Sequence, residues 1–305
     1  MADEIVYSGI GDLTTTEVIS GEFLKLRSST EALPNHPALQ YVGSINGRGS
    51  NTIKVPHVGL MGGYNPLAPS ADGAAVANTA LVDSSSTVAV TRQSLRREFS
   101  DLAAMVRPDL VNPSEFALDA LDAYSARLTD LICDVIDGFV ATAGSSGSDL
   151  TLVDVLSAIG TAKGLYAVGP WMGVLHTQQW ADFIADAGVT SAGTLQWQPA
   201  TAEMMQLRTA AFQGSYLGVD WFVSSRVVTA NAGADRAGAV FARGAVLWAD
   251  GSPAVRDPAN QILVGGSVLF ERERTSANGL DAYTSHAYMG VAKGVEYGVS
   301  IITDA

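Results

Sequence analysis

The stretch NPSEFALDALDAYSARLTDLICDVIDGFVATAG, residues 112–144, decides the fold. Asn112 suits a helix N-cap, Pro113 suits the first helical position, and Glu115 suits the position that caps the helix reciprocally. The glycine that closes the stretch is a common helix stop signal. The pattern therefore predicts one helix over Pro113–Ala143. At about 1.5 Å per residue it would span roughly 45 Å, well above the average helix.

The predicted helix has two different faces. At about 100° per residue, its apolar side chains gather on one side and five aspartates gather on the other. The apolar side comprises Ala117, Leu121, Tyr124, Leu128, Leu131, Ile132, Val135 and Phe139, and the acidic side comprises Asp119, Asp122, Asp130, Asp134 and Asp137. Aspartates are able to bind metal, but these lie along an open stripe with no histidine or second acidic cluster beside them. We therefore interpret the stripe as a solvated face and expect no metal site.

Residues 41–92 are predicted to form an extended two-stranded loop. Asn51–Val58 and Ser86–Thr91 have strand-like composition. Most of the linker between them, Met61–Ser85, consists of Gly, Ala, Ser, Thr, Pro, Asn or Asp, which leaves too few large side chains for a core. A lone hairpin is marginal in water, so we expect the loop to lie on a neighbouring subunit. Its three bases against two acids make it slightly basic, and therefore complementary to an acidic body.

Residues 93–148 are predicted to be helical, with the long helix as their main element. Arg92, Arg96 and Arg97 form the only basic cluster in the chain, at the start of this region. Because two acidic residues follow within a few positions, a salt-bridged face or a subunit contact is a better interpretation of the cluster than a nucleic-acid site.

The remaining residues, 149–305, are predicted to alternate helices and strands. Expected helices are Leu150–Ala162 and Thr177–Ala187, and segments that contain strands are Trp171–His176, Val219–Ser224, Ala239–Leu247, Ile262–Arg274 and Tyr283–Ile302. Glycines recur every four residues in the last segment, which favours two or three twisted strands over one long helix.

Residues 1–40 are predicted to be an arm. Helix-like spacing of apolar residues follows three threonines at Thr14–Thr16, and Pro34 and Pro37 end any helix. A surface helix packed on its own domain is the alternative interpretation of this acidic stretch.

Composition limits the class of protein. The 305 residues include 31 acids and 18 bases, so the net charge is −13, and 47% of residues are hydrophobic. That is enough apolar material for a sizeable core, while the negative charge makes the chain a poor general binder of nucleic acid. A single cysteine, Cys133, excludes an intramolecular disulfide framework and fits a reducing compartment. We expect neither a signal peptide nor a membrane-spanning helix.

Motifs for catalysis are absent from the sequence. It contains no nucleophile elbow, phosphate-binding loop, zinc-binding helix motif or paired cysteines. The four histidines are scattered, and carboxylates near Cys133 would raise the pKa of its thiol, which argues against a nucleophile. We assign no catalytic, cofactor-binding or metal residues. An enzyme whose site is assembled from scattered residues is the alternative of a different class.

The order of these parts resembles the major capsid protein of tailed double-stranded DNA bacteriophages, which has the Hong Kong 97-like fold. The resemblance rests on the loop strand GSNTIKVP at residues 49–56, the strand Thr87–Thr91, the long capped helix, and two segments, GPWMGVLHTQQW at 169–180 and GSYLGVDWFVSSR at 214–226. It covers nearly the whole chain, but its motifs are patterns of element order and not catalytic signatures.

The resemblance implies an α+β fold with five parts. These are an N-terminal arm (1–40), an extended loop (41–92), a peripheral domain with a spine helix (93–148), a mixed α/β axial domain (149–264), and C-terminal strands that return to the peripheral domain (265–305). We expect inter-subunit contacts at Arg48, Lys54, Pro56, Tyr64, Arg92, Arg96 and Arg97.

The resemblance also implies a function. The chain would self-assemble as pentamers and hexamers into an icosahedral shell that encloses phage DNA without sequence-specific binding, and it would be located in the virion after assembly in the host cytoplasm. A portal is expected as a partner. The arm that precedes the loop is short, so a separate scaffolding protein is expected in place of a fused segment. An encapsulin-type compartment shell shares the fold and is the nearest alternative.

Overall fold

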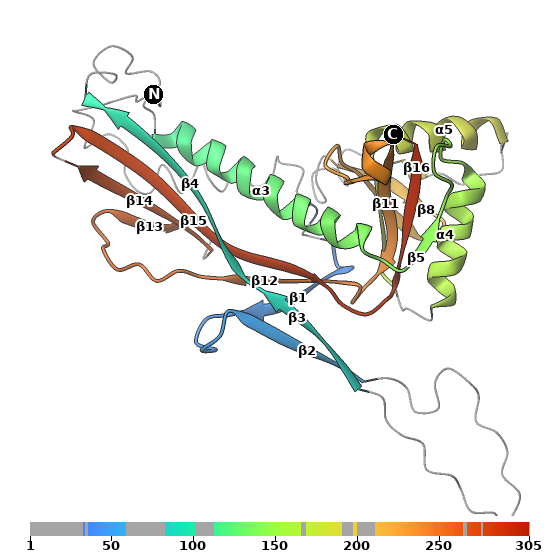
Figure 1. The fold of residues 1–305 in the computed structure, drawn as a ribbon, viewed down its shortest axis with the longest axis horizontal. Coiled ribbons are helices and arrows are strands. Elements are labelled where there is room, and N and C mark those ends of the chain that lie inside the picture. The colour runs from blue at the N-terminus through green and yellow to red at the C-terminus, as the bar shows by residue number, and fades with distance from the viewer. Residues whose placement is uncertain are drawn as a thin grey trace, which may run out of the picture.

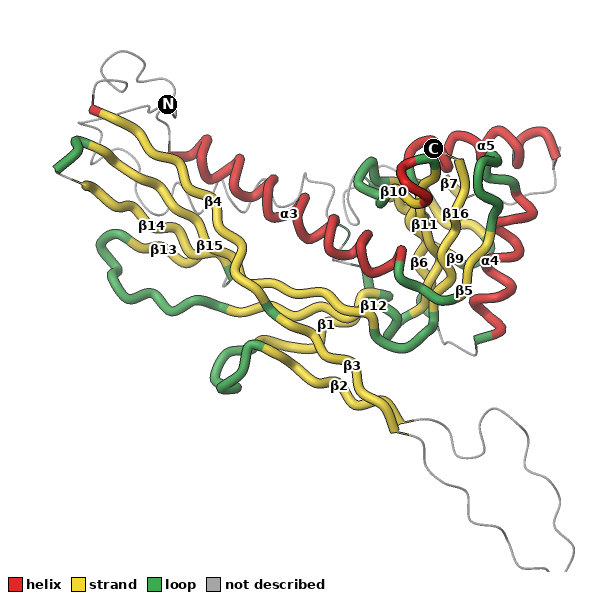
Figure 2. Tube along the Cα trace, in the orientation of Figure 1, coloured by secondary structure: helices red, strands yellow, loops and turns green. Residues whose placement is uncertain are grey.

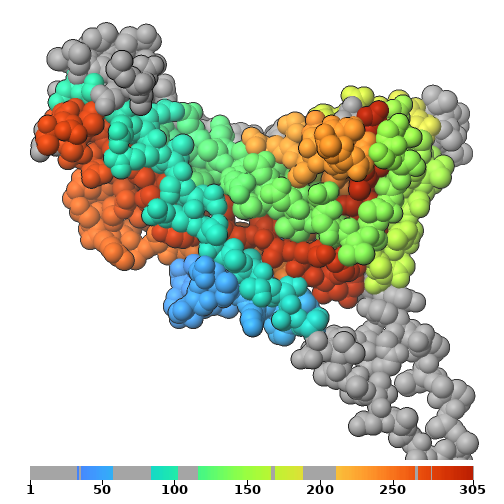
Figure 3. Space-filling model, in the orientation of Figure 1, coloured from blue at the N-terminus to red at the C-terminus, as the bar shows by residue number. Residues whose placement is uncertain are grey.

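The structure, a computed structural model, describes residues 33, 36–58, 83–101, 113–165, 169–190, 198–199, 211–264, 267–275 and 277–304. In this part of the chain, three α-helices and two large β-sheets form an elongated α+β molecule with two parts (Figure 1). A third, two-stranded sheet forms a hairpin that projects from the body, as the tube and space-filling views show (Figures 2 and 3).

One part of the molecule is built on a six-stranded sheet, called here the long sheet. Its order is β1 (Leu39–Ser44), β12 (Val246–Gly251), β15 (Leu280–Lys293), β14 (Val268–Thr275) and β13 (Gln261–Val264), with β4 (Thr91–Ser100) also paired to β15. Apart from the parallel β1–β12 pair, the strands are antiparallel. The fourteen-residue β15 is the central strand of this sheet, because β4, β12 and β14 all pair with it.

The other part is built on an eight-stranded sheet, called here the wide sheet. Its order is β5 (Ala141–Ala143), β16 (Gly298–Asp304), β11 (Asp235–Ala242), β6 (Trp171–Leu175), β9 (Val219–Val223), β8 (Phe212–Tyr216) and β7 (Gln198–Pro199), with β10 (Thr229–Ala230) paired to β11 beside a short 3₁₀ turn (Asn231–Gly233). Helices α4 (Leu152–Gly164) and α5 (Thr177–Thr190) share one core with this sheet. Both match the helices predicted there, with ends that differ by no more than three residues.

The long helix α3 (Pro113–Asp137) begins where the sequence predicts but ends six residues early. Gly138 follows it, Phe139 turns into the core at 4% exposure, and Ala141–Ala143 pair in parallel with β16. The prediction that the helix continues to Ala143 is wrong because these last residues gain a sheet partner, which overrides their local preference.

The predicted faces of α3 are confirmed. Ala117, Leu121, Tyr124 and Ile132 are buried, whereas four of the five predicted acids are exposed and Asp130 is half-buried. The helix crosses from one part of the molecule to the other (Figure 1), and its apolar side enters two cores in turn. Its N-terminal half packs on the long sheet, and its C-terminal half packs on the wide sheet.

The start of the predicted helical region is wrong. Residues 91–100 form β4, which pairs with β15 from Thr91–Met289 to Ser100–Leu280. Leu95, Arg97 and Phe99 alternate with more polar neighbours, and the period of two places them toward α3. The basic residues between them hid this alternation in the sequence.

The predicted two-stranded loop is present with different limits. β2 (Thr52–Val58) and β3 (Asp83–Ala89) pair antiparallel, from Thr52–Ala89 to Val58–Asp83. The second strand therefore begins three residues earlier than predicted, and Val90 separates it from β4. Residues 59–82, which hold most of the predicted linker, lie outside the described residues.

Strand pairing also crosses the predicted domain limits. β12 and β13, expected in the axial domain, belong to the long sheet, while β5 and β16, expected in the peripheral domain, belong to the wide sheet. β1 spans the predicted limit between arm and loop at residues 40 and 41. The chain passes between the two parts several times, and no change in composition marks these crossings.

Gln179 illustrates how the wide sheet holds its helices. Its side chain is fully buried, accepts a hydrogen bond from the His176 backbone, and donates to the Arg236 carbonyl and the Thr303 hydroxyl at 3.0 and 2.9 Å. The amide thus joins the start of α5 to β11 and β16.

We predict that Gln179→Leu lowers the free energy of unfolding by about 2–4 kcal/mol, because the buried His176 N–H and Arg236 carbonyl lose their bonds to the Gln179 side chain. Urea unfolding followed by circular dichroism measures the change. Gln178→Leu is the matched control, because Gln178 is exposed and its loss should cost less than about 0.5 kcal/mol. Equal midpoints for the two variants would contradict the assignment.

Asp235 fixes the loop after β5 to β11. Its buried carboxylate accepts hydrogen bonds from the Ser146 hydroxyl at 2.6 Å, from Asn231, and from the Gly147 backbone at 3.0 Å. These bonds favour the charged form and lower the pKa of Asp235.

Because the folded-state pKa lies below the unfolded value of about 3.9, the stabilisation is complete above about pH 4 and disappears as the pH falls through the folded pKa. Asp235→Asn should therefore lower the urea midpoint at pH 7, and the gap to wild type should narrow below pH 4. Asp137→Asn, on an exposed position of α3, should show neither effect. A gap that is independent of pH would refute the role of the charge.

Candidate inter-subunit surfaces

The inner face of the β2–β3 hairpin packs on the long sheet. Ile53 and Val88 point inward and, with Val90, pack on Leu247 and Ala249 of β12 in a small separate core. The hairpin therefore covers one end of the face of the long sheet that lies opposite α3. This burial sets the position of the hairpin.

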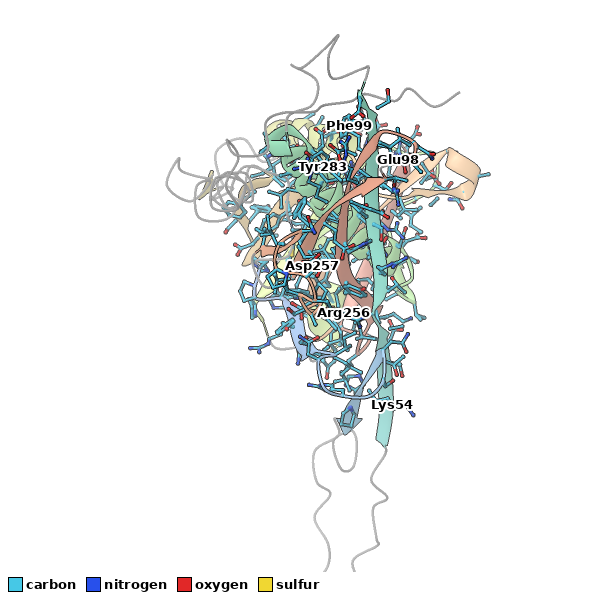
Figure 4. All side chains as sticks on the ribbon, turned by 90° about the vertical axis from the view of Figure 1, so that its left-hand side faces the viewer. Lys54, Glu98, Phe99, Arg256, Asp257 and Tyr283 are labelled. Carbon is cyan, nitrogen blue, oxygen red and sulfur yellow. The ribbon has the colours of Figure 1, made fainter. Side chains whose placement is uncertain are left out.

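The outer face of the hairpin is polar and carries one described charge. Cross-strand pairs place Thr52 beside Ala89, Lys54 beside Thr87, and Pro56 beside Ser85. All except the half-buried Thr52 are exposed. Lys54 lies on the projecting hairpin, apart from the labelled residues of the body (Figure 4). These positions hold small side chains and one cation, a charge that is complementary to an acidic surface.

Arg48 lies in the exposed turn that precedes the hairpin, close to an aromatic pair. Its guanidinium approaches the Cα of Gly43 so closely that a Cβ there would lie 3.0 Å from it, and Gly43 has a φ of +110°. Tyr41 packs against Trp248 with ring centroids 4.6 Å apart and ring planes tilted by 47°, and its hydroxyl donates to Asp250 at 2.7 Å. Partial burial and this hydrogen bond raise the pKa of Tyr41 to about 12.

The aromatic pair was missed by sequence reasoning. Tyr41 is 48% exposed, and tyrosine, tryptophan and arginine are the residues most enriched at the centres of protein interfaces. Its partner Trp248 lies on β12, in the second half of the chain, so no local signal could have joined the two rings. We add Tyr41 and Trp248 to Arg48 as a candidate contact surface.

The three arginines of β4, Arg92, Arg96 and Arg97, were predicted to form one cluster, but they do not lie together. Arg97 faces α3, where it pairs with Asp119 at 2.7 Å and lies over the Phe116 ring at 5.9 Å. Arg96 points to the opposite face and pairs with Glu98 at 2.6 Å. The strand conformation separates adjacent residues to opposite faces.

Of the two interpretations given to the arginine cluster, the salt-bridged face is therefore present for Arg96 and Arg97. Arg92 is exposed on the same side of β4 as Arg96. Tyr64 lies outside the described residues. The role of these four residues at subunit contacts stays a prediction.

Side chains of the types that act in catalysis, such as cysteine and histidine, have structural roles in the described part of the chain. Cys133 is buried in the core between α3 and the wide sheet, and burial, with smaller effects from Asp130 and Asp134, raises the pKa of its thiol to about 12. The expected direction is confirmed, but its main cause is burial and not the acidic face. The described residues contain no group of three or more metal-ligating side chains, and none of their helices is long and apolar enough to cross a membrane.

The histidines also join strands. His36 is buried and bonds Asp220 at 3.0 Å, which fixes the segment before β1 to β9. His286 lies between Ser94 at 2.8 Å and Glu271 at 3.3 Å, an order of groups found in hydrolases. Here, however, the three residues occupy adjacent antiparallel strands on the open face of the long sheet, and Ser94 is exposed. They form a cross-strand polar ladder.

No protein-family model matches the sequence, and no curated protein does. Solved structures do match over almost the full chain. The capsid of Ralstonia phage GP4 superposes with a TM-score of 0.61 at 10% identity, covering 90% of both chains. The capsid of the cyanophage P-SCSP1u has a TM-score of 0.56 at 10% identity, covering 98% of this chain and 92% of that one.

Not every structural neighbour is a phage capsid. The SrpI encapsulin complex of Synechococcus elongatus superposes with a TM-score of 0.56 at 12% identity, covering 98% of this chain and 92% of that one. Most neighbours are nevertheless tailed-phage major capsid proteins. The chain therefore has the fold of that class of protein, and the resemblance predicted from the sequence is confirmed at the level of the fold.

We predict that Lys54→Glu leaves the thermal unfolding midpoint unchanged, because Lys54 is exposed, but reduces assembled material several-fold by placing an acid against an acidic neighbour. Sedimentation velocity measures the assembled fraction. Lys54→Arg keeps the charge and should assemble like wild type. Wild-type assembly by Lys54→Glu would remove this residue from the contact surface.

Proposed function

We propose that this chain is the major structural protein of an icosahedral capsid that encloses phage double-stranded DNA. The observation that carries the proposal is the match of nearly the whole chain, 98% in one case, to phage capsid proteins. A similarity that covers a single domain would allow another function to reside elsewhere. Here the neighbours are structural proteins, which points away from an enzyme.

In this proposal each part of the fold has a role. The long sheet with the N-terminal half of α3 is the peripheral domain, and the wide sheet with α4 and α5 is the axial domain at the centre of pentamers and hexamers. The β2–β3 hairpin is the root of the extended loop that lies on the adjacent subunit, and the residues before β1 are the arm. Arg48, Lys54 and Pro56 would contact that neighbour.

The charge distribution agrees with a container for DNA. A wall with a net charge of −13 per subunit would not bind the polyanion that is packaged inside it. Enclosure then needs no sequence-specific contact. A scaffolding protein, a portal, assembly in the host cytoplasm and a final location in the virion complete the proposal.

A compartment that encloses protein is the second candidate, favoured by one specific observation. The encapsulin complex and a virus-like particle from Pyrococcus furiosus both superpose with a TM-score of 0.56. The fold is thus compatible with either content. The content of purified particles distinguishes the two: nuclease-protected double-stranded DNA supports a capsid, whereas a co-purifying enzyme supports a compartment.

Expression of the full chain, with and without a scaffolding protein from the same source, tests the proposal. Negative-stain electron microscopy and sedimentation velocity should show closed shells, partial shells, or discrete pentamers and hexamers. A chain that remains a monomer or dimer with the scaffold present would overturn the proposed function.

A deletion tests the extended loop. Loss of Met61–Ser85 would remove part of β3, so the sharper variant deletes residues 61–80 and spares both strands. We expect a soluble subunit with an unchanged unfolding midpoint, because the hairpin is anchored by its own small core, and at least a tenfold loss of closed shells. Shells of normal yield and size would refute the role of the loop.

A further inference from the structure

The helices that cover the wide sheet have outward faces almost without charge. The exposed positions of α4 are Val153, Leu156, Ser157, Gly160, Thr161, Lys163 and Gly164, and the exposed positions described on α5 are Thr177, Gln178, Ala181, Ile184 and Ala185. We call these twelve positions the helix layer. Lys163 carries its only charge, and its ammonium group bonds the Leu217 carbonyl at 3.3 Å.

The half-buried aspartates of these helices are engaged within the subunit. Asp154 caps α4 through Thr151, and Asp186 accepts from the Leu152 backbone at 2.7 Å, which ties α5 to the start of α4. Asp182 accepts from Gln178 at 3.2 Å. The carboxylates of Asp154 and Asp186 therefore serve a cap and a contact between the helices, while that of Asp182 bonds a side chain one turn earlier on α5 itself.

Large apolar side chains are exposed on this layer. Val153 is 69% exposed, Leu156 is 44% exposed and Ile184 is 40% exposed. Gly160 and Gly164 lie in open space, where a Cβ would meet no atom within 4 Å. Nothing described within the subunit requires Gly160, although glycine in the middle of a helix is less favourable than alanine.

The layer contrasts with the solvent face of α3 in the same chain. The exposed face of α3 carries Asp119, Asp122, Asp134 and Asp137, as a helix face that stays in water normally does. The described exposed positions of α3 thus include four acids, whereas the described exposed positions of α4 and α5 include none, and the aspartates Asp154, Asp182 and Asp186 of those two helices are half-buried. The difference indicates that the helix layer is covered.

We propose that the helix layer is a contact surface for a second copy of this chain. Two subunits that each carry a net charge of −13 repel each other, so they can meet most closely where neither presents acids. In a ring, each subunit meets its neighbours through two different surfaces. The helix layer is one of the two, and this assignment rests on the proposed shell function.

Thiol labelling tests the proposal with little disturbance of the fold. Cys133 is fully buried and is the only native cysteine, so Ser157→Cys introduces one accessible thiol at the centre of the outward face of α4. We expect a maleimide to label it at least tenfold more slowly in assembled particles than in free subunits. Ala123→Cys, on the exposed face of α3, should label at similar rates in both. Equal rates for Ser157→Cys in the two states would overturn the proposal.

A charge substitution provides the second test. Leu156→Glu should leave the unfolding midpoint close to that of wild type, since the residue is exposed, and reduce the yield of particles at least tenfold. Ala123→Glu adds the same charge on α3 and should assemble normally. If wild type forms particles and Leu156→Glu forms them in equal yield, the helix layer is not a contact while the shell function stands. If wild type forms none with scaffold present, both proposals fail.

Discussion

The packing of one helix into two cores is the interaction on which the structure depends. Phe116 and Tyr124 of α3 lie against the long sheet, while Ile132 and Ile136 lie against the wide sheet. Hydrogen bonds reinforce both ends: the Tyr124 hydroxyl bonds Ser285 of β15, and the Ser300 hydroxyl of β16 donates to the Ile136 carbonyl at 2.6 Å. Because a helix is rigid, the spacing of its apolar residues sets the distance between the two parts.

This arrangement explains which features could be predicted from the sequence. The start of α3, its two faces, and helices α4 and α5 follow from patterns that span a few turns, and the sequence contains those patterns in full. The pairing of the hairpin strands follows from their alternation. In each case the deciding interactions join residues close together in the chain.

The predictions that were wrong concern segments whose structure depends on residues far away in the chain. The end of α3 depends on β16, the last strand of the chain, and β4 is a strand because β15, also near the C-terminus, pairs with it. The residues from 93 onward were predicted to be helical, but β4 alternates with a period of two, which turns Arg97 toward Asp119 and Phe116. Local propensity is a weak guide wherever a distant strand provides hydrogen bonds.

Only some residues of the candidate contact surfaces could be selected from the sequence. Arg48, Lys54 and Pro56 could be selected because they lie in or beside a projecting hairpin whose pattern was visible. The pair of Tyr41 and Trp248 could not, because its members come from strands that only the fold brings together. The helix layer needed a further step, since an uncharged helix face signals a contact only once its other face is known to be buried. Leu152, Val155 and Ile159 fill the core beneath α4, so the outward side chains of that helix have no place within the subunit.

The low identity to structural neighbours follows from the same physics. At 10% identity, the capsid of Ralstonia phage GP4 still superposes over nine-tenths of both chains. A fold constrains the volume and patterning of its cores more than the identity of each side chain, because many sets of apolar residues fill the same space. In the proposed shell, contacts between copies have to match only within one particle, so residues such as those of the helix layer would be free to diverge together. A surface of this kind is therefore recognised from the exposure and the charge of its side chains within one structure.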